Sequence, residues 1–333
     1  MSDSAAVRRP RAPLWQKALP WAITAVCFYF MWRRIAGTAA RNGQDVSAYM
    51  RQVLDAVSWG PWLALMIPYS LLYLVIDTAV VWRAINWFNT PVRYREVLPI
   101  RASAYIISIL NEQVGKGAIA LYMNRRHGIP GWEIGSSMLF IMVCEIYSLL
   151  AWATFGWFMA RDALPREFDL IPWLALAGAI AFAAMTAFFA GKLRVGAALR
   201  DRAIFRAFRQ ASPWHYLGIV AIRAPSILIA VGVYTAAAHL FGIEVSLRQM
   251  LGYVPVVFFG AAFPTPMRAV AITLWVHLFS SHAGEASIFG FVQHNFFVFF
   301  NAAIGLCFLR RAYRELFDSE ASPMTPSRQV PPT

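Results

Sequence analysis

The sequence predicts an all-α fold: a polytopic membrane helix bundle of about six spanning helices plus two re-entrant helical hairpins. Hydrophobic residues make up 59% of the chain, charged residues only 14%, and the mean hydropathy is +0.51. This composition is typical of a chain that lies in a bilayer and carries its charges in the loops. Apolar stretches of about 20 residues, long enough to cross the hydrocarbon core, recur along the sequence. Two more apolar stretches are broken in the middle.

The predicted spanning helices have tryptophan or tyrosine near their ends, as an aromatic belt requires. They lie at about residues 15–33, 61–83, 136–160, 170–190, 215–241 and 286–309. The first ends at Arg33-Arg34, and no convincing cleavage site precedes these arginines, so we expect a retained helix and not a removed signal peptide. Residues 1–14 are then a cytoplasmic tail, 15–310 the membrane domain and 311–333 a proline-rich, disordered cytoplasmic tail.

The first broken stretch runs from Pro99 to Arg125 and has a polar break at residues 111–117, which reads NEQVGKG. Each apolar limb has about 14 residues and reaches only ~20 Å at ~1.5 Å per residue. The hydrocarbon core is ~30 Å thick, so we expect the limbs to enter and leave by one face. Unwound backbone at that depth is tolerated only beside protein or water, which makes the break a candidate binding site. The alternative is a loop at the membrane surface.

The second broken stretch runs from Met250 to Phe279, and Pro264-Thr265-Pro266 interrupts it just before Arg268. Proline inside a helix removes a backbone donor and clashes with the preceding turn, so two at this spacing favour a break. Paired interrupted segments in two halves of a membrane protein point to a transport site. The alternative is one kinked spanning helix.

Loop charges set the expected orientation. Arginines concentrate in the loops around residues 83–95, 125–126, 192–209 and 310–314, whereas 161–169 and 242–249 carry little net positive charge. The positive-inside rule therefore predicts cytoplasmic N- and C-termini in a bacterial-type inner membrane, with one hairpin entering from each side. Four basic residues remain on the outer face in this arrangement: Arg33, Arg34, Arg41 and Arg51.

Ionisable residues inside apolar segments are costly and are candidates for function. The break residues Asn111, Glu112 and Lys116 and the post-break Arg268 form one group. Within spanning helices the candidates are Asp77, Glu145 and Arg223. We hypothesise that Glu145 balances Lys116 or Arg268; the alternative is buried ion pairs that only fix helix packing.

Other chemistry has little support in the sequence. The three cysteines lie in apolar segments, and the histidines match no zinc signature, so we expect no metal and no cofactor. We find no nucleophile elbow, phosphate loop or dinucleotide fingerprint in context. The arginine excess fits loop topology better than nucleic-acid binding.

The stretch from Ser103 to Trp152 resembles the lysylphosphatidylglycerol synthase transmembrane, or flippase-like, family. The resemblance rests on a short limb, a break with Asn111 and Gly115, basic residues at 125–126, a Gly-Ile-Pro turn at 128–130 and the internal Glu145. The chain departs from the family where Glu112-Gln113 replaces a Pro-Gly pair. It also lacks the glycine run of the family's second motif, while keeping Pro264 and Pro266.

The resemblance implies a divergent member that moves a phospholipid or isoprenoid-linked lipid between leaflets and lacks the soluble aminoacyl-transferase domain of some relatives. Because the resemblance implies a lipid substrate, we expect an anionic lipid as partner, with Lys116 and Arg268 attracting its phosphate beside half-helix N-termini. The alternatives are a membrane-embedded transferase acting on a lipid, or a membrane scaffold that does not transport.

Overall fold

The computed structural model describes residues 14–108, 112–192, 196–262, 265 and 268–317, and within them every regular element is a helix. Some helix residues, Glu112 and Lys116 among them, have side chains outside the described part. Short 3₁₀ turns join several helices. The α-helices are α1 (Leu14–Arg41), α2 (Val46–Ala56), α3 (Trp59–Phe88), α4 (Tyr94–Ser108), α5 (Glu112–His127), α6 (Gly131–Ala160), α7 (Ile171–Phe189), α8 (Ala197–Arg200), α9 (Arg206–Gln210), α10 (Pro213–Leu240), α11 (Leu247–Ala261), α12 (Ala269–Leu278) and α13 (Ala283–Phe317).

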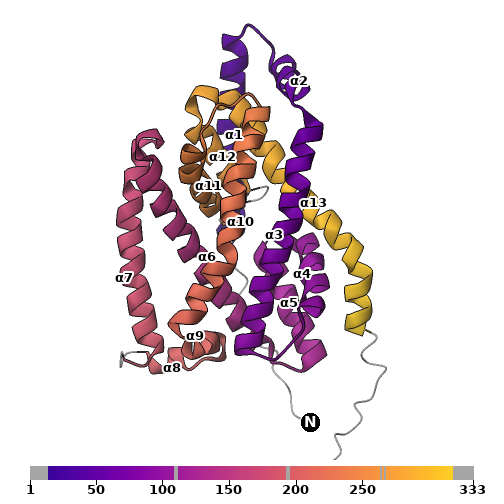
Figure 1. Ribbon diagram of the computed structural model, residues 1–333, viewed down its shortest axis with the longest axis vertical. Helices are drawn as coiled ribbons and strands as arrows, with labels where there is room; N and C mark the ends of the chain where they lie inside the picture. The colour runs from indigo at the N-terminus through magenta and orange to yellow at the C-terminus, as the bar shows by residue number, and fades with distance from the viewer. Residues whose placement is uncertain (1–13, 109–111, 193–195, 263–264, 266–267, 318–333) are drawn as a thin grey trace, which may run out of the picture.

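Five described helices are long and apolar enough to cross a membrane, namely α3, α6, α7, α10 and α13. They match five of the six predicted spans and run roughly along the long axis of the molecule (Figure 1). The chain is therefore a multi-pass membrane protein. With 28 to 30 residues, α3, α6 and α10 each reach ~42–45 Å, more than the hydrocarbon core requires.

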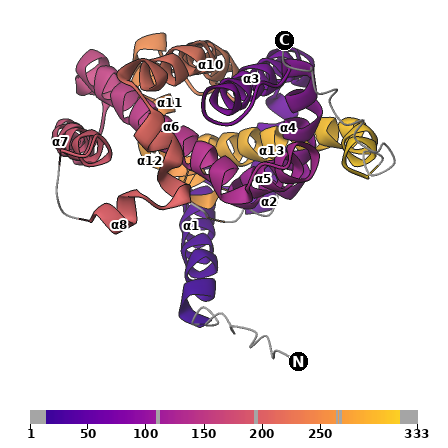
Figure 2. The same cartoon turned by 90° about the horizontal axis from the view of Figure 1, so that it is seen from below.

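The sixth predicted span, 15–33, forms a helix but is not one of these five. The prediction that Arg33-Arg34 ends it is wrong, because α1 continues to Arg41, with Ala36, Ala39 and Ala40 as good helix formers in the added part. Gly43, with a φ of +65°, follows the helix. Figure 2 shows the N-terminal part of α1 projecting from the bundle, and Trp21 and Tyr29 are correspondingly exposed.

The helix α2 was not predicted and lies at the same end of the molecule as the C-terminal end of α1 (Figure 1). Asp45 caps it by accepting hydrogen bonds from the Ser47 hydroxyl at 2.6 Å and from the Ser47 backbone N–H at 3.0 Å. Those hydrogen bonds lower the pKa of the Asp45 carboxyl. Tyr49 and Val53 of α2 are buried against the bundle.

Two pairs of short helices form hairpins, the first from α4 and α5 and the second from α11 and α12. Their 15, 16, 15 and 10 residues reach only ~15–24 Å each, so none of them crosses alone. The hairpins occupy opposite halves of the molecule (Figure 1). The prediction of two hairpins is confirmed in the described residues, in place of a surface loop or one kinked helix. Residues 109–111, 263–264 and 266–267, between the paired limbs, lie outside the described part.

The first limb of each hairpin packs against a spanning helix at a glycine of that helix. At Gly305 of α13, an added Cβ would lie 2.5 Å from the carbonyl oxygen of Ala102 in α4. At Gly156 of α6, it would lie 2.4 Å from the carbonyl oxygen of Leu251 in α11. Only glycine permits backbones this close, so α4 packs on α13 and α11 packs on α6 over their lengths.

The two halves repeat one order of elements in opposite directions. A spanning helix, a hairpin and a second spanning helix form both α3–α6 and α10–α13, and α7 lies between these halves in the chain. Proline lies inside both leading helices, at Pro68 and Pro225, and inside both first limbs, at Pro99 and Pro255. This supports the hypothesis of an inverted pair.

The two loops predicted to face outward lie together at one end. Arg248 pairs with Asp162 at 3.1 Å, which joins the loop after α6 to the start of α11. Many basic residues gather at the opposite end, where α3 and α5 finish and α6 and α10 begin (Figure 1). They include Arg93, Arg95, Arg125, Arg126, Arg200, Arg202, Arg206 and Arg209.

Candidate functional site

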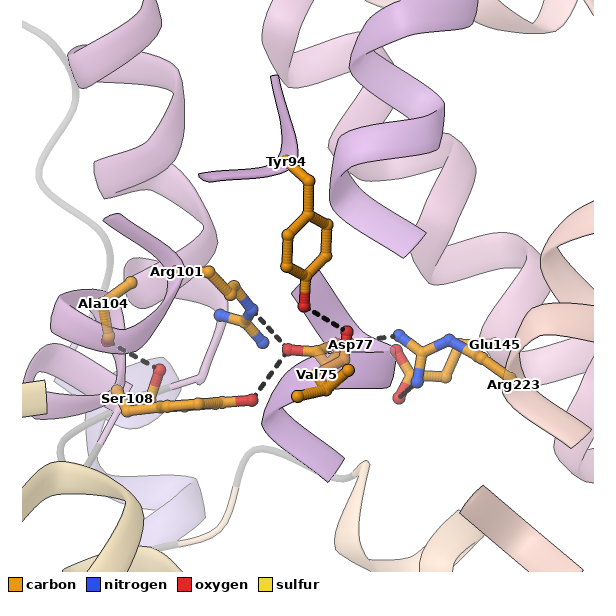
Figure 3. A network of polar contacts seen from close by, with 9 residues as sticks. Val75, Asp77, Tyr94, Arg101, Ala104, Ser108, Glu145 and Arg223 are labelled. Atoms are coloured by element: carbon orange, nitrogen blue, oxygen red, sulfur yellow. Dashed lines mark hydrogen bonds and ion pairs between the residues drawn. The ribbon is translucent and has the colours of Figure 1, made fainter. Parts of the chain in front are cut away.

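A buried carboxylate, Asp77, lies at the centre of the site, on α3. Its side chain is 3% exposed, and its Oδ2 accepts hydrogen bonds from Arg101 Nε and, at 2.9 Å, from the Tyr105 hydroxyl. Both donors belong to α4, where a spacing of four residues puts them on one face. Asp77 therefore ties the first hairpin to α3 (Figure 3).

Arg223 extends this network across the bundle. It is buried on α10, and its Nη2 lies 3.3 Å from Asp77 Oδ1, while its Nη1 lies 3.4 Å from Glu145 Oε1. Glu145 lies midway along α6 and is 20% exposed, far more than Asp77. The four charged side chains thus alternate in sign across four helices, as Figure 3 shows. Alternation compensates the desolvation of each charge, which is large at this depth.

The sequence analysis missed Arg101, which is 2% exposed and pairs directly with Asp77. It named Asp77 as a candidate in a spanning helix but gave it no partner, whereas the structure turns Asp77 toward α4. The sequence carried one unspecific signal: Arg101 and Tyr105 are four residues apart, so they share one helix face and can both donate to a buried acid in a neighbouring helix.

A cavity of about 110 Å³, the main cavity, opens beside Glu145 and Arg223. Arg268 lines it too, and so does Ser148, whose hydroxyl is buried and has no hydrogen-bond partner among the described residues. The cavity is not fully enclosed, and Ile146, one of its lining residues, is 44% exposed. The remaining lining is mostly aromatic and aliphatic, and its aromatic members are Tyr69, Tyr73, Tyr234, Phe258 and Phe297.

Arg268 precedes α12 and adopts a left-handed backbone conformation, with φ of 52° and ψ of 38°. It is the only described non-glycine residue with a positive φ. Its guanidinium lies 5.5 Å from the centre of the Phe297 ring, a cation–π contact. Strain of this kind persists where surrounding structure holds it and tends to mark functional sites.

A smaller cavity of about 20 Å³, the side cavity, adjoins the main cavity, because Tyr73, Arg268 and Phe297 line both. The side cavity is also lined by Arg101 and Tyr105 of the first hairpin. Together the two cavities extend from α4 of the first hairpin to α11 of the second.

The structure brings four predicted site residues together. Asp77, Glu145 and Arg223 form one network, and Arg268 shares the main cavity with Glu145 and Arg223. Glu145 contacts Arg223, which the hypothesis of a Lys116 or Arg268 partner did not include.

The structure does not place the side chains of the other three predicted site residues. Asn111 lies outside the described residues, and so do the side chains of Glu112 and Lys116. The backbone at Glu112 and Lys116 belongs to α5, so the helix of the second limb begins inside the predicted break.

No group of three potential metal ligands occurs within the described ranges. His277 lies 3.8 Å from Glu167, at the end of the bundle where Arg248 pairs with Asp162, and neither residue lines the main or the side cavity. The arrangement offers charge recognition, because two arginines, one carboxylate, hydroxyls and aromatic faces surround a partly open cavity.

Comparison of the chain with protein-family models, with curated proteins and with solved structures found no match.

Proposed function

We propose that this protein binds the phosphate-bearing headgroup of an anionic lipid in the main cavity and passes it between the leaflets of the membrane. The observation that carries the proposal is the pair of arginines, Arg223 and Arg268, in a cavity among helices that cross the bilayer. Guanidinium groups bind phosphate oxygens with several parallel hydrogen bonds and remain charged when desolvated.

The shape of the cavity supports a lipid more than a free anion. Exposed Ile146 at the rim leaves a path by which acyl or isoprenoid chains stay in the bilayer while the headgroup enters. Aromatic side chains supply an apolar wall, and the Ser148 hydroxyl is a further donor without a described partner. Two hairpins from opposite ends, meeting around a central site, match the geometry of alternating access.

The resemblance to the lysylphosphatidylglycerol synthase transmembrane family agrees with this proposal and remains part of it. We also propose an inner-membrane location with cytoplasmic termini, because the basic end of the bundle would then face the cytoplasm.

A flipping assay tests the proposal. The purified chain is reconstituted into vesicles with tail-labelled fluorescent phosphatidylglycerol or phosphatidylcholine, and a membrane-impermeant reductant then bleaches the label it can reach. We expect wild-type protein to make inner-leaflet phosphatidylglycerol accessible faster than phosphatidylcholine. Arg268→Gly should abolish the difference, since glycine tolerates the left-handed backbone but lacks the guanidinium.

The matched control is Arg248→Gln, which removes an exposed arginine at the outer end of the bundle and should leave flipping unchanged. Equal flipping by wild type and Arg268→Gly would contradict the proposal. A covalently altered lipid in the vesicle extract would favour a transferase, and inactivity of the wild type would leave the scaffold as the better account.

A further inference from the structure

The side cavity contains a buried acceptor that nothing else in the described structure uses. Asn301, on α13, is 2% exposed, and its Nδ2 donates to the Phe297 carbonyl at 2.8 Å. This bond fixes the amide orientation, so the atom left over is Oδ1, which only accepts. Asn301 Oδ1 has no hydrogen-bond partner among the described residues. A buried polar atom in this state costs free energy unless a water or ligand supplies a donor.

The groups around Asn301 restrict what can supply that donor. The Ser108 hydroxyl donates to the Ala104 carbonyl at 3.0 Å, and the Tyr105 hydroxyl donates to Asp77, so both oxygens offer only lone pairs to the cavity. A phosphodiester oxygen could accept from the lining arginines, but it has no proton to donate and would leave Asn301 Oδ1 unsatisfied. An ammonium group could donate but would lie beside Arg101 and Arg268, which also line the cavity.

The group must donate to Asn301 Oδ1 and must be compatible with the neighbouring arginines. A neutral hydroxyl does both, because it donates to Asn301 Oδ1 and accepts from a guanidinium. The volume of about 20 Å³ accommodates little more than one group of water size, for which ~10–15 Å³ suffices. The shared wall of Tyr73, Arg268 and Phe297 places this hydroxyl next to a phosphate in the main cavity.

We infer that the side cavity is a subsite for a hydroxyl group of the lipid headgroup, so that the protein selects phosphodiester lipids whose headgroup is a neutral polyol. This inference rests on the proposed function and narrows it to one substrate class. Asn301 is then a specificity-determining residue, and Arg268 lies between the phosphate and the hydroxyl.

Two lipids of equal charge test the inference. Phosphatidylglycerol and phosphatidylpropanol both carry a single negative phosphodiester and a three-carbon headgroup, but phosphatidylpropanol lacks the hydroxyls. Their affinities for the full chain in detergent are measured by competition with a fluorescent anionic lipid. We expect wild type to bind phosphatidylglycerol about tenfold more tightly, the effect of one buried hydrogen bond.

Asn301→Leu should weaken phosphatidylglycerol binding about tenfold and leave phosphatidylpropanol binding unchanged, which also shows that the variant is folded. The matched control is Asn295→Leu. Asn295 donates to the Phe291 carbonyl at 2.7 Å on the same helix, as Asn301 does to Phe297, but it lines neither cavity. Asn295→Leu should keep the preference.

The outcomes separate the two proposals. Equal binding of both lipids by wild type overturns the hydroxyl subsite alone, and the side cavity then holds only water. Failure of both lipids to bind overturns the proposed function and the subsite together. If Asn301→Leu still binds phosphatidylglycerol more tightly than phosphatidylpropanol, the role of Asn301 is overturned.

Discussion

Arg268 combines a strained backbone with a charge in a cavity, and these two properties can be separated. A left-handed conformation costs a residue with a Cβ roughly 1–2 kcal/mol, and glycine largely avoids this cost. The φ of 52° therefore implies that the surrounding structure holds arginine in a backbone conformation that would strain glycine less. We attribute this to the use of the guanidinium between the main and side cavities.

Arg268→Gly and Arg268→Ala both remove the guanidinium, but only the alanine variant keeps the backbone strain. We expect the glycine variant to be the more stable by ~1 kcal/mol, seen as a melting temperature a few degrees higher in the same detergent. Both variants should lose anionic-lipid binding to the same extent. Alanine as stable as glycine would argue against strain at this residue.

Asp77 is the residue on which the polar network depends. Asp77→Asn keeps the shape but leaves buried Arg101 and Arg223 without their shared carboxylate. Breaking a buried pair from one side costs ~3–5 kcal/mol, so we expect a large loss of thermal stability. Asp162→Asn, which breaks an exposed pair with Arg248, is the control and should have little effect. Equal effects of the two substitutions would contradict a buried network.

At the scale of single residues, the sequence identified candidate site residues but not the side chains with which they pair. Asp77, Glu145 and Arg223 were recognisable because a charge in an apolar helix is costly. Arg101 was not, because it lies in a limb that also contains Tyr94 and Glu96 and looks like the polar start of a helix. Which arginine pairs with which carboxylate depends on how α3, α4 and α10 are rotated and packed against one another. The periodicity of a single helix does not determine this packing.

At the scale of elements, two glycines set the depth to which the hairpins approach the long helices. Gly305 admits α4 and Gly156 admits α11, in each case with a carbonyl where a Cβ would lie. The short limbs were predictable from length, since ~20 Å cannot cross ~30 Å. The positions at which these limbs pack on the long helices were not predictable, because a glycine in an apolar helix gives no sign of which backbone approaches it.

We expect Gly156→Ala and Gly305→Ala each to push a hairpin outward, lowering thermal stability and slowing lipid flipping. The control is Gly232→Ala in the spanning helix α10, where an added Cβ meets nothing within 4 Å and alanine is the better helix former. The measurements are melting temperature and flipping rate in the same preparation. Loss of stability in Gly232→Ala equal to that in Gly156→Ala would remove the argument from close packing.

At the scale of the whole molecule, charge is distributed unequally between the two ends. Arginines crowd the end where α3 and α5 finish, and acids accompany the arginines at the other end. The separation of a strongly basic end from a mixed-charge end was visible in the loop charges, whereas the projecting α1 and the added helix α2 could not be predicted. The position of α1 follows from its contacts with α12 and α13, and that of α2 from its contacts with α1 and α13.

Cysteine labelling tests this topology. In a cysteine-free background, Ser281→Cys lies in the exposed turn between α12 and α13, and Leu199→Cys lies in exposed α8 at the basic end. We expect an impermeant maleimide to label the first in intact cells and the second only after permeabilisation. Labelling of both from the same side would contradict the arrangement of crossings.

The most direct test of the central claim, that the arginine-lined cavity holds an anionic lipid headgroup, is native mass spectrometry of protein released from mild detergent. We predict that the wild type retains an anionic phospholipid or isoprenoid phosphate and that Arg268→Gly does not, while Arg248→Gln retains it as the wild type does. The same anionic lipid bound equally by wild type and Arg268→Gly, or only zwitterionic lipid bound by the wild type, would contradict the claim.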